Sequence, residues 1–413
     1  MPHETPLISI IVVGLCLAFV LGLLAHRLRL PLIAGYLVAG VVIGPFTPGF
    51  VADQALASQL AELGVILLMF GVGLHFSLAD LLAVRRIAIP GAIGQISVAS
   101  MAGMGLGWAL GWGLSAGLIF GLSLSVASTV VLLRALQERQ LLMTGQGRTA
   151  VGWLIVEDLV MVVVLVLIPP LAGLMGGEAV PVADGVATEV VRLGFAPVWA
   201  TLLITAVKLA AFLALMLVVG RRVIPWILHY VAHTGQRELF RLSVLSIALG
   251  VAYGSAQFFG VSFALGAFFA GMVMAGSTLA TQAMKDTLPM REAFSVLFFV
   301  SVGMLFDPAV LWEDPLPLLV TVAIILGVKS VAAYLIVRAF GHGQDMALII
   351  AASLAQIGEF SFILIVMGVD LDIVPPVARD LVVAGALLSI LVNPLMFHAI
   401  DRWRRLRPAP PPI

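Results

Sequence analysis

Long apolar runs, separated by short polar breaks, repeat along almost the whole chain and limit its fold more than any other feature. The sequence is 62% hydrophobic and 11% charged, with a mean hydropathy of +1.15, which no water-soluble globular protein approaches. About 20 residues of α-helix cross a hydrocarbon core of roughly 30 Å, whereas transmembrane barrels show alternating segments of about ten residues. The chain is therefore predicted to be an all-α polytopic membrane protein.

The polar breaks divide the apolar runs into about thirteen predicted transmembrane helices. These helices are placed near residues 7–25, 31–46, 57–76, 88–113, 116–136, 148–173, 196–220, 237–258, 262–277, 292–306, 315–339, 345–369 and 377–399. Most of the 22 Lys and Arg residues fall in the breaks after odd-numbered helices, and only Arg192 and Arg379 follow even-numbered ones. By the positive-inside rule, the N-terminus is predicted outside and the C-terminus in the cytoplasm.

Six charged residues lie further inside the predicted spans than the others. They are Glu62, Glu157, Asp158, Lys208, Lys329 and Glu359. A charged side chain in the bilayer is costly unless it faces a polar cavity, finds a partner, or takes up a proton or cation. Glu62 lies close to a helix end and Lys208 in a connecting helix, where a structural role is the simpler interpretation.

Two adjacent acids, Glu157 and Asp158, lie near the middle of the apolar run 147–171. They are about 100° apart on a helix, so we expect them to have different tasks at a cation and proton site. Lys329 lies around the middle of a later run and is predicted to pair with one of the two acids. The alternatives are that the acids anchor helices through hydrogen bonds and that Lys329 reaches backbone carbonyls at the cytoplasmic rim.

Two polar segments inside apolar runs indicate broken helices. The segment 121–133 holds Ser128 and Thr129, and the segment 351–362 holds Gln356, Gly358 and Glu359. Discontinuous helices direct helix ends and carbonyl groups at a transported ion, and a transporter with inverted repeats has one in each half. The alternative is an intact helix in which Ser and Thr hydroxyls bond back to carbonyls.

The positions of these segments predict a domain organisation of two inverted six-helix repeats with crossed broken helices. The repeats cover about residues 7–173 and 237–399, a linker helix covers 196–220, and a basic, proline-rich tail covers 402–413.

Several function classes lack their sequence signatures. No GxxxxGK[ST] run supports ATP-driven transport, and no TVGYG-like filter is present. No HExxH motif occurs, and the one GxSxG match, at 113–117, falls in a turn, so an enzyme is not expected. The remaining alternatives to an antiporter are a gated cation channel and a proton-coupled symporter of organic anions. The symporter predicts basic residues near the crossing, where Lys329 is the only one available.

Five motifs in order along the chain resemble the membrane domain of the cation:proton antiporter-2 family, in particular its Kef-like potassium:proton antiporters. The motifs are LAELGVILLMFGVGLHFSLADL, SLSVASTVVLLRALQE, GWLIVEDLVMVVVL, FFVSVGMLFDP and SLAQIGEFSFIL. The resemblance implies a sodium:proton-antiporter-like fold with a dimerisation domain and an ion-carrying core. It also implies a homodimer in a bacterial inner membrane and elevator-type alternating access.

The resemblance also assigns residue roles. Asp158 matches the family's essential ion- and proton-binding aspartate, which makes it the expected site of a monovalent metal cation. Glu157 occupies a position that is glutamine in typical Kef proteins and aspartate in electrogenic sodium:proton exchangers, and Lys329 matches the lysine that pairs with that acid in the electrogenic group. This departure from the Kef pattern leaves two properties open: the selectivity for potassium or sodium, and the number of protons exchanged per cation.

We therefore expect exchange of potassium, with sodium as the alternative, for protons at Asp158. Ser128 and Thr129 are expected to complete the cation's oxygen shell, and Lys329 to hold Glu157 ionised. No cofactor and no nucleic acid is expected, and the expected partners are membrane lipid and a second copy of the chain. Kef-like proteins also carry a cytoplasmic nucleotide-binding domain, so a regulatory domain or subunit is a further expected partner.

Overall fold

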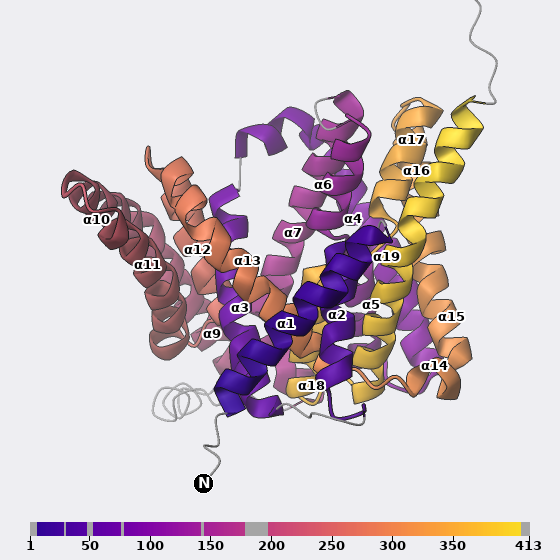
Figure 1. Ribbon diagram of the computed structural model, residues 1–413, viewed down its shortest axis with the longest axis horizontal. Coiled ribbons are helices and arrows are strands. Elements are labelled where there is room, and N and C mark those ends of the chain that lie inside the picture. The colour runs from indigo at the N-terminus through magenta and orange to yellow at the C-terminus, as the bar shows by residue number, and fades with distance from the viewer. Residues whose placement is uncertain are drawn as a thin grey trace, which may run out of the picture. The chain divides into compact units, whose positions relative to one another are not determined.

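The computed structural model describes residues 6–28, 30–47, 53–75, 78–141, 144–177 and 197–405. Every regular element in these ranges is a helix, as the sequence predicts (Figure 1). The α-helices are α1 Pro6–Arg27, α2 Leu32–Ile43, α3 Gln54–His75, α4 Leu78–Ala109, α5 Leu114–Ser125, α6 Thr129–Glu138, α7 Gly145–Leu171, α9 Pro197–Ala214, α10 Arg221–His233, α11 Arg237–Phe259, α12 Phe263–Ala275, α13 Ala280–Met304, α14 Val310–Glu313, α15 Pro315–Ala323, α16 Lys329–Ala339, α17 Gln344–Leu354, α18 Glu359–Asp370 and α19 Pro376–Arg405. A 3-10 turn, η1, covers Ala172–Leu174, and two π-helical turns, η2 and η3, cover Leu215–Gly220 and Ile324–Val328. Arg192 and the predicted tail beyond residue 405 lie outside the described residues.

The described helices are those of a multi-pass membrane protein. Eight of them are long and apolar enough to cross a bilayer, or nine if α17 and α18, which are bent by 43°, form one span. Three shorter apolar helices, α2, α5 and α12, accompany them. The predicted count of thirteen spans and the inverted repeat stay predictions.

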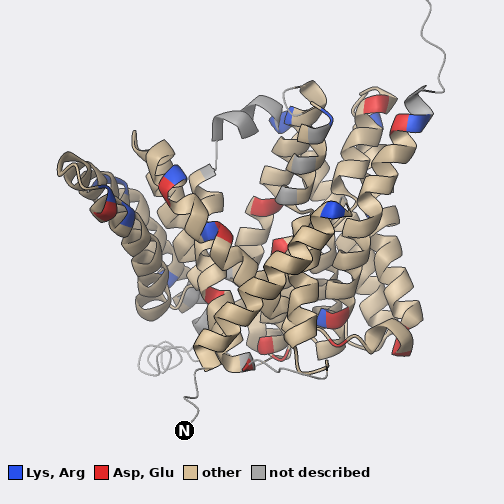
Figure 2. Cartoon of the chain, in the orientation of Figure 1, with Lys and Arg blue, Asp and Glu red and all other residues tan. Residues whose placement is uncertain are grey.

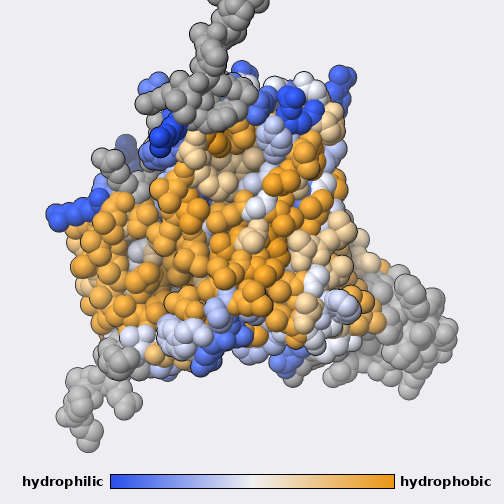
Figure 3. All heavy atoms as spheres, turned by 90° about the vertical axis from the view of Figure 1, so that its right-hand side faces the viewer, coloured by the Kyte–Doolittle hydropathy of each residue, from blue (hydrophilic) through white to orange (hydrophobic). Residues whose placement is uncertain are grey.

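Charge and hydropathy are distributed as a membrane requires. Charged residues colour mainly the ends of the helices, and most of the length of each helix carries none (Figure 2). The face in Figure 3 has a broad band of hydrophobic residues, with hydrophilic residues along its upper and lower edges. Leu316 on α15 and Leu335 on α16 are 70% and 58% exposed, which suits side chains that contact lipid.

Three predicted helix limits are wrong because charged residues were taken as breaks. Helix α4 begins at Leu78, where a start near residue 88 was predicted, and α13 begins at Ala280, where a start near 292 was predicted. The helix that begins at Pro197 continues to His233, where an end near 220 was predicted. Arg, Lys and Glu are good helix formers, so a charged segment ends an apolar run without ending the helix.

The chain forms two compact units, each drawn from both halves of the sequence. The first unit comprises Met1–Val20, Tyr36–Ser77 and Val162–Leu305, and the second comprises Leu21–Gly35, Leu78–Met161 and Phe306–Ile413. In the first unit, α3 packs against α12 and α13. In the second unit, α4 packs against α5, and α16 packs against both α4 and α17 (Figure 1).

A hydrophobic core in the second unit supports the middle of α7. Trp153 is fully buried, and the ring lies so close to Gly91 of α4 that a Cβ on that residue would be 2.3 Å from it. Leu132 of α6, Ala333 of α16 and Ile350 of α17 belong to the same core. Because Trp153 lies one helical turn before Glu157, this core fixes the position of the acid pair on α7.

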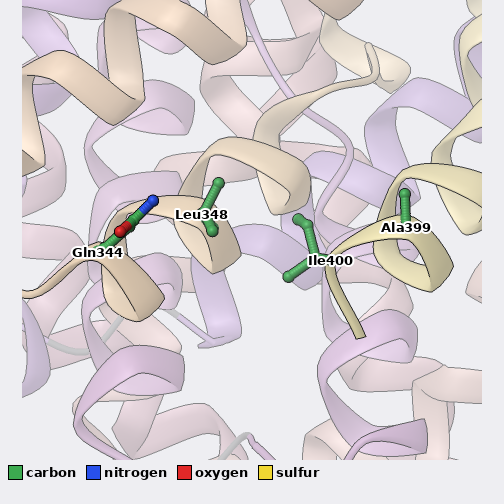
Figure 4. Close-up of a pocket in the computed structure, with 4 residues that line it drawn as sticks. All are labelled: Gln344, Leu348, Ala399 and Ile400. Carbon is green, nitrogen blue, oxygen red and sulfur yellow. The ribbon is translucent and has the colours of Figure 1, made fainter. Parts of the chain in front are cut away.

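A small groove lies at one end of the second unit, between the first turns of α17 and the C-terminal part of α19. It has a volume of about 340 Å³ and is lined by Gln344, Leu348, Ala399 and Ile400 (Figure 4). None of the predicted site residues lines it, so the groove is separate from the polar residues described next.

Candidate functional site

The helix predicted over residues 116–136 is interrupted at residues 126–128, which we call the first break. Here α5 ends at Ser125, and Val126 has extended backbone angles (φ −102°, ψ 134°). Ser128 caps the N-terminus of α6, and its Oγ accepts a hydrogen bond from Val131 N at 3.3 Å. Serine at this position satisfies one of the N–H groups that a helix start leaves without a partner.

The helix predicted over residues 345–369 is interrupted at residues 355–358, which we call the second break. It separates α17, which ends at Leu354, from α18, which begins at Glu359. Both polar segments therefore contain a break in the helix, and the alternative of two intact helices does not hold for the described structure.

The two breaks contact each other through Gln356 and Ser128. Gln356 Oε1 accepts a hydrogen bond from Ser128 N at 2.8 Å, and Gln356 Nε2 donates one to Ser128 O at 3.1 Å. One side chain thus satisfies both backbone groups of a residue outside regular helix, which a nonpolar environment requires. Gly358 permits the approach, because a Cβ there would lie 2.6 Å from Ser128 Cα.

Glu157 is fully buried on α7 and binds the first break. Its Oε2 accepts a hydrogen bond from Ala127 N at 2.8 Å. Ala127 precedes the N-terminus of α6, where the positive end of the helix dipole favours a negative charge. This carboxylate therefore holds the backbone of the break in place.

Asp158 is buried beside the same break, but its two oxygens have different surroundings. Oδ2 accepts a hydrogen bond from Thr129 Oγ1 at 3.2 Å. Oδ1 is buried and has no hydrogen-bond partner among the described residues. Glu157 and Glu359 both lie close enough to repel the Asp158 charge. This arrangement favours a species that brings positive charge to Asp158, either a proton or a cation.

Glu359 is the first residue of α18 and is 5% exposed. Its Oε2 lies 3.5 Å from Ser128 Oγ, which donates to it. A third acid, after Glu157 and Asp158, therefore contacts the first break, and it comes from the other broken helix.

Lys329 is fully buried at the start of α16, directly after the π-helical turn η3. Its Nζ donates a hydrogen bond to Gln356 O in the second break at 2.8 Å. Among the described residues, its ammonium has no ion pair with Glu157 within 4.0 Å, although the two charges attract each other. The hydrogen bond thus goes to a buried carbonyl of the second break, whereas the alternative considered from the sequence placed the carbonyls at the cytoplasmic rim. Glu157 provides a more distant countercharge.

The second unit contains all eight residues that the sequence analysis assigned to the site. They are Ser128, Thr129, Glu157, Asp158, Lys329, Gln356, Gly358 and Glu359. The other two charged residues inside predicted spans belong to the first unit, where Lys208 is partly buried and the side chain of Glu62 is exposed.

Two buried amides at the breaks were not found from the sequence. Gln95 of α4 donates to Ser125 O at 2.9 Å, and Asn393 of α19 donates to Ala352 O at 2.7 Å. Each amide therefore serves a carbonyl near the C-terminal end of a half-helix. The only signal in the sequence is a single amide residue inside an otherwise apolar run, which is weaker than a charged residue or a cluster of polar residues.

Within the described ranges, no group of three or more His, Cys, Asp and Glu side chains has the arrangement of a metal site. The oxygens that the structure places near Asp158 are those of the Thr129 hydroxyl and of the Glu157 and Glu359 carboxylates, which suit hard cations.

The sequence matches the family described as sodium/hydrogen exchanger, transmembrane, over residues 15–403. The chain belongs to this family. It is 59% identical over 403 residues to YbaL of Escherichia coli (strain K12), whose name assigns it provisionally to cation/proton antiport. That alignment covers 98% of this chain and 70% of YbaL, and it confirms the resemblance to the Kef-like members of the cation:proton antiporter-2 family.

Two further comparisons agree with this assignment. The K(+) efflux antiporter 4 of Arabidopsis thaliana is 34% identical over 380 residues, which cover 90% of this chain and 60% of the plant protein. The solved structure of the sodium proton antiporter MjNhaP1 from Methanocaldococcus jannaschii at pH 8 superposes with a TM-score of 0.68 over 96% of this chain and 98% of that one. At 16% identity, this second likeness establishes an antiporter-like fold alone.

Proposed function

We propose that the chain exchanges a monovalent cation, with potassium preferred and sodium the alternative, for protons across a bacterial inner membrane. Membership of the sodium/hydrogen exchanger family and the similarity to K(+) efflux antiporter 4 support the reaction class and the cation class. The expected orientation has the N-terminus outside and the C-terminus in the cytoplasm, as the distribution of Lys and Arg predicts.

The observation that carries the proposal is the buried Asp158 carboxylate beside two contacting helix breaks. Its Oδ1 has no hydrogen-bond partner within the described structure, and two further acids lie nearby. A carboxylate held in this way is stable only when something neutralises it. Either a proton or a partly dehydrated cation does so, with Thr129 Oγ1, Ser128 Oγ and nearby carbonyls as additional oxygens.

Exchange follows from competition for that carboxylate. A proton on Asp158 abolishes the charge that attracts the cation, so the two substrates exclude each other. If the protein with an unoccupied, charged Asp158 does not switch the access of the site from one side of the membrane to the other, each switch must carry either a proton or a cation. The coupled result is antiport.

Glu157 and Lys329 have supporting roles in this proposal. Glu157 holds Ala127 of the first break, and Lys329 holds the Gln356 carbonyl of the second. Their mutual attraction keeps both charged, so each break stays fixed while Asp158 changes its ligand. If Glu157 also takes up a proton in the cycle, two protons move per cation, and otherwise one does.

The domain roles are part of the same proposal. The second unit, which contains the site, is the ion-carrying core, and the first unit is the dimerisation domain of a homodimer. The two breaks belong to the fifth helices of two inverted six-helix repeats in a fold of thirteen spans, and the core moves in an elevator-type cycle.

Proteoliposomes that contain the purified chain test the proposal. An imposed pH gradient should dissipate only when potassium or sodium is present on the opposite side, and Asp158→Asn should abolish this flux. Glu157→Gln should retain exchange with a reduced rate, and Glu62→Gln, an exposed acid of the first unit, should behave as wild type. Cation-dependent exchange by Asp158→Asn would refute the role of this carboxylate, and flux driven by voltage alone would indicate a channel.

A further inference from the structure

Gln95 is a fully buried side chain of α4 whose two amide atoms have different surroundings. Its Nε2 donates to Ser125 O at 2.9 Å, whereas its Oε1 is buried without a hydrogen-bond partner among the described residues. The carbonyl fixes this orientation, because a rotated amide would place two acceptor oxygens together. A buried acceptor without a donor is costly and calls for a ligand that brings positive charge or a proton.

Gln95 and Glu157 bind the same short piece of backbone from two helices. Gln95 binds Ser125 O and Glu157 binds Ala127 N, two residues further along the chain. The helices that carry them are also in contact one turn earlier, where Gly91 of α4 lies against Trp153 of α7. Gln95 therefore belongs, with Glu157, to the side chains that bind the backbone at the first break.

The second break shows what the first one lacks. There the Ala352 carbonyl receives the Asn393 amide at 2.7 Å, and the Gln356 carbonyl receives the Lys329 ammonium at 2.8 Å. The C-terminal end of a helix carries a partial negative charge, which a cation stabilises. The second break thus has a permanent cation, the Lys329 ammonium, whereas the donors that the structure describes at the end of α5 are neutral: the Gln95 amide on Ser125 O and the Ser125 hydroxyl on Leu122 O.

We propose that Gln95 is a ligand of the transported cation. Its Nε2 holds the C-terminal end of α5, and its Oε1 supplies a neutral oxygen to a partly dehydrated monovalent cation whose charge is balanced by Asp158. Amide and carbonyl oxygens replace water around alkali cations in other membrane proteins. The inference rests on the proposed antiport at Asp158 and adds an oxygen from α4, outside the two broken helices.

The test measures cation-dependent proton flux in proteoliposomes over a series of potassium and sodium concentrations. Gln95→Leu removes the oxygen and the donor, and Asn393→Leu is a matched control that removes the equivalent donor at the second break. Gln95→Lys keeps a donor for Ser125 O and places a tethered ammonium where the cation's oxygen would be. This variant should therefore fold even if Gln95→Leu does not.

We expect Gln95→Leu to raise the half-saturating cation concentration about tenfold, the effect of losing one favourable polar contact. Asn393→Leu should lower the maximal rate and leave half-saturation unchanged. Gln95→Lys should abolish cation-dependent flux. The inference is overturned if Gln95→Lys still exchanges cations, or if Gln95→Leu and Asn393→Leu change the same parameter to the same extent.

The same assay separates this inference from the proposed function. If wild type exchanges cations, Asp158→Asn does not, and the Gln95 variants keep wild-type half-saturation, the antiport proposal stands and the role of Gln95 fails. If Asp158→Asn also exchanges cations, the proposed function itself fails.

Discussion

The two helix breaks of the second unit have the same construction but different charge. In each, a half-helix ends, three or four residues leave the helix, and a second half-helix begins. Carbonyls of the second break and its half-helix receive an ammonium and an amide, whereas Ser125 O at the first receives an amide. Acidic side chains from α7 face the first break.

We propose that this difference keeps the second break permanently neutralised and leaves the first break to the transported ions. Lys329 acts in the second break as a cation that never leaves. At the first break, Asp158 Oδ1 has no hydrogen-bond partner in the described part of the chain, and in the proposed cycle a transported ion neutralises this carboxylate. The predictions below test that contrast, beginning with the largest expected effect.

Removal of the permanent cation should be the most damaging change. Lys329→Met leaves the Gln356 carbonyl without its donor and Glu157 without its countercharge, which should lower the free energy of unfolding by about 3–5 kcal/mol. Thermal unfolding in detergent measures the loss. Lys208→Met, at the partly buried lysine of the first unit, is the control and should change stability much less.

The double variant Lys329→Met with Glu157→Gln sharpens this result. Because the second change removes the uncompensated charge, the double variant should recover part of the lost stability. A double variant that is no more stable than Lys329→Met would show that the two charges are not coupled.

The contact between the breaks should be the next most sensitive feature. Gly358→Ala places a methyl group 2.6 Å from Ser128 Cα, where the neighbour is backbone and cannot easily move. We expect a loss of about 1–3 kcal/mol in stability and of most transport activity. Gly105→Ala on α4, with nothing within 4 Å of the added Cβ, is the control. Equal transport by both variants would show that the breaks need not approach so closely.

A smaller effect distinguishes a helix cap from a site residue. Ser128 and Ser262 cap α6 and α12 in the same way, and each Oγ accepts a backbone N–H three residues later at 3.3 Å. Ser128→Ala and Ser262→Ala should each cost about 1 kcal/mol of stability. Only Ser128→Ala should also raise the half-saturating cation concentration, since Ser128 belongs to the first break and is bound by Gln356 of the second. Equal transport parameters in both variants would restrict Ser128 to capping.

The buried charges of the second unit could be located from the sequence, because a carboxylate or an ammonium in an apolar run has few purely structural explanations; that they form a cation and proton site stays a prediction. Asp158, Glu157 and Lys329 were identified for that reason, and the polar segments around Ser128 and Gln356 indicated the breaks. Gln95 escaped notice because one neutral amide in an apolar run is compatible with many local hydrogen bonds. Its significance depends on the position of Ser125 O, which only the fold provides.

Helix limits were the other weak point, and the reason is physical. Hydropathy records where a helix leaves the hydrocarbon, whereas the helix itself continues as long as its backbone bonds are favourable. Accordingly, α13 begins at Ala280 and runs through Lys285 and Arg291 before its apolar part. The direct hydrogen bond of Lys329 to a carbonyl likewise required the geometry of the second break.

The pH dependence of cation affinity tests the central claim most directly. If proton and cation compete for the Asp158 carboxylate, the half-saturating cation concentration should rise about tenfold for each unit of decreasing pH in the acidic range, with an unchanged maximal rate. Solid-supported membrane recordings or proton-flux assays on wild-type proteoliposomes measure both parameters. A half-saturating concentration that stays constant while only the maximal rate changes with pH would contradict competition at one carboxylate.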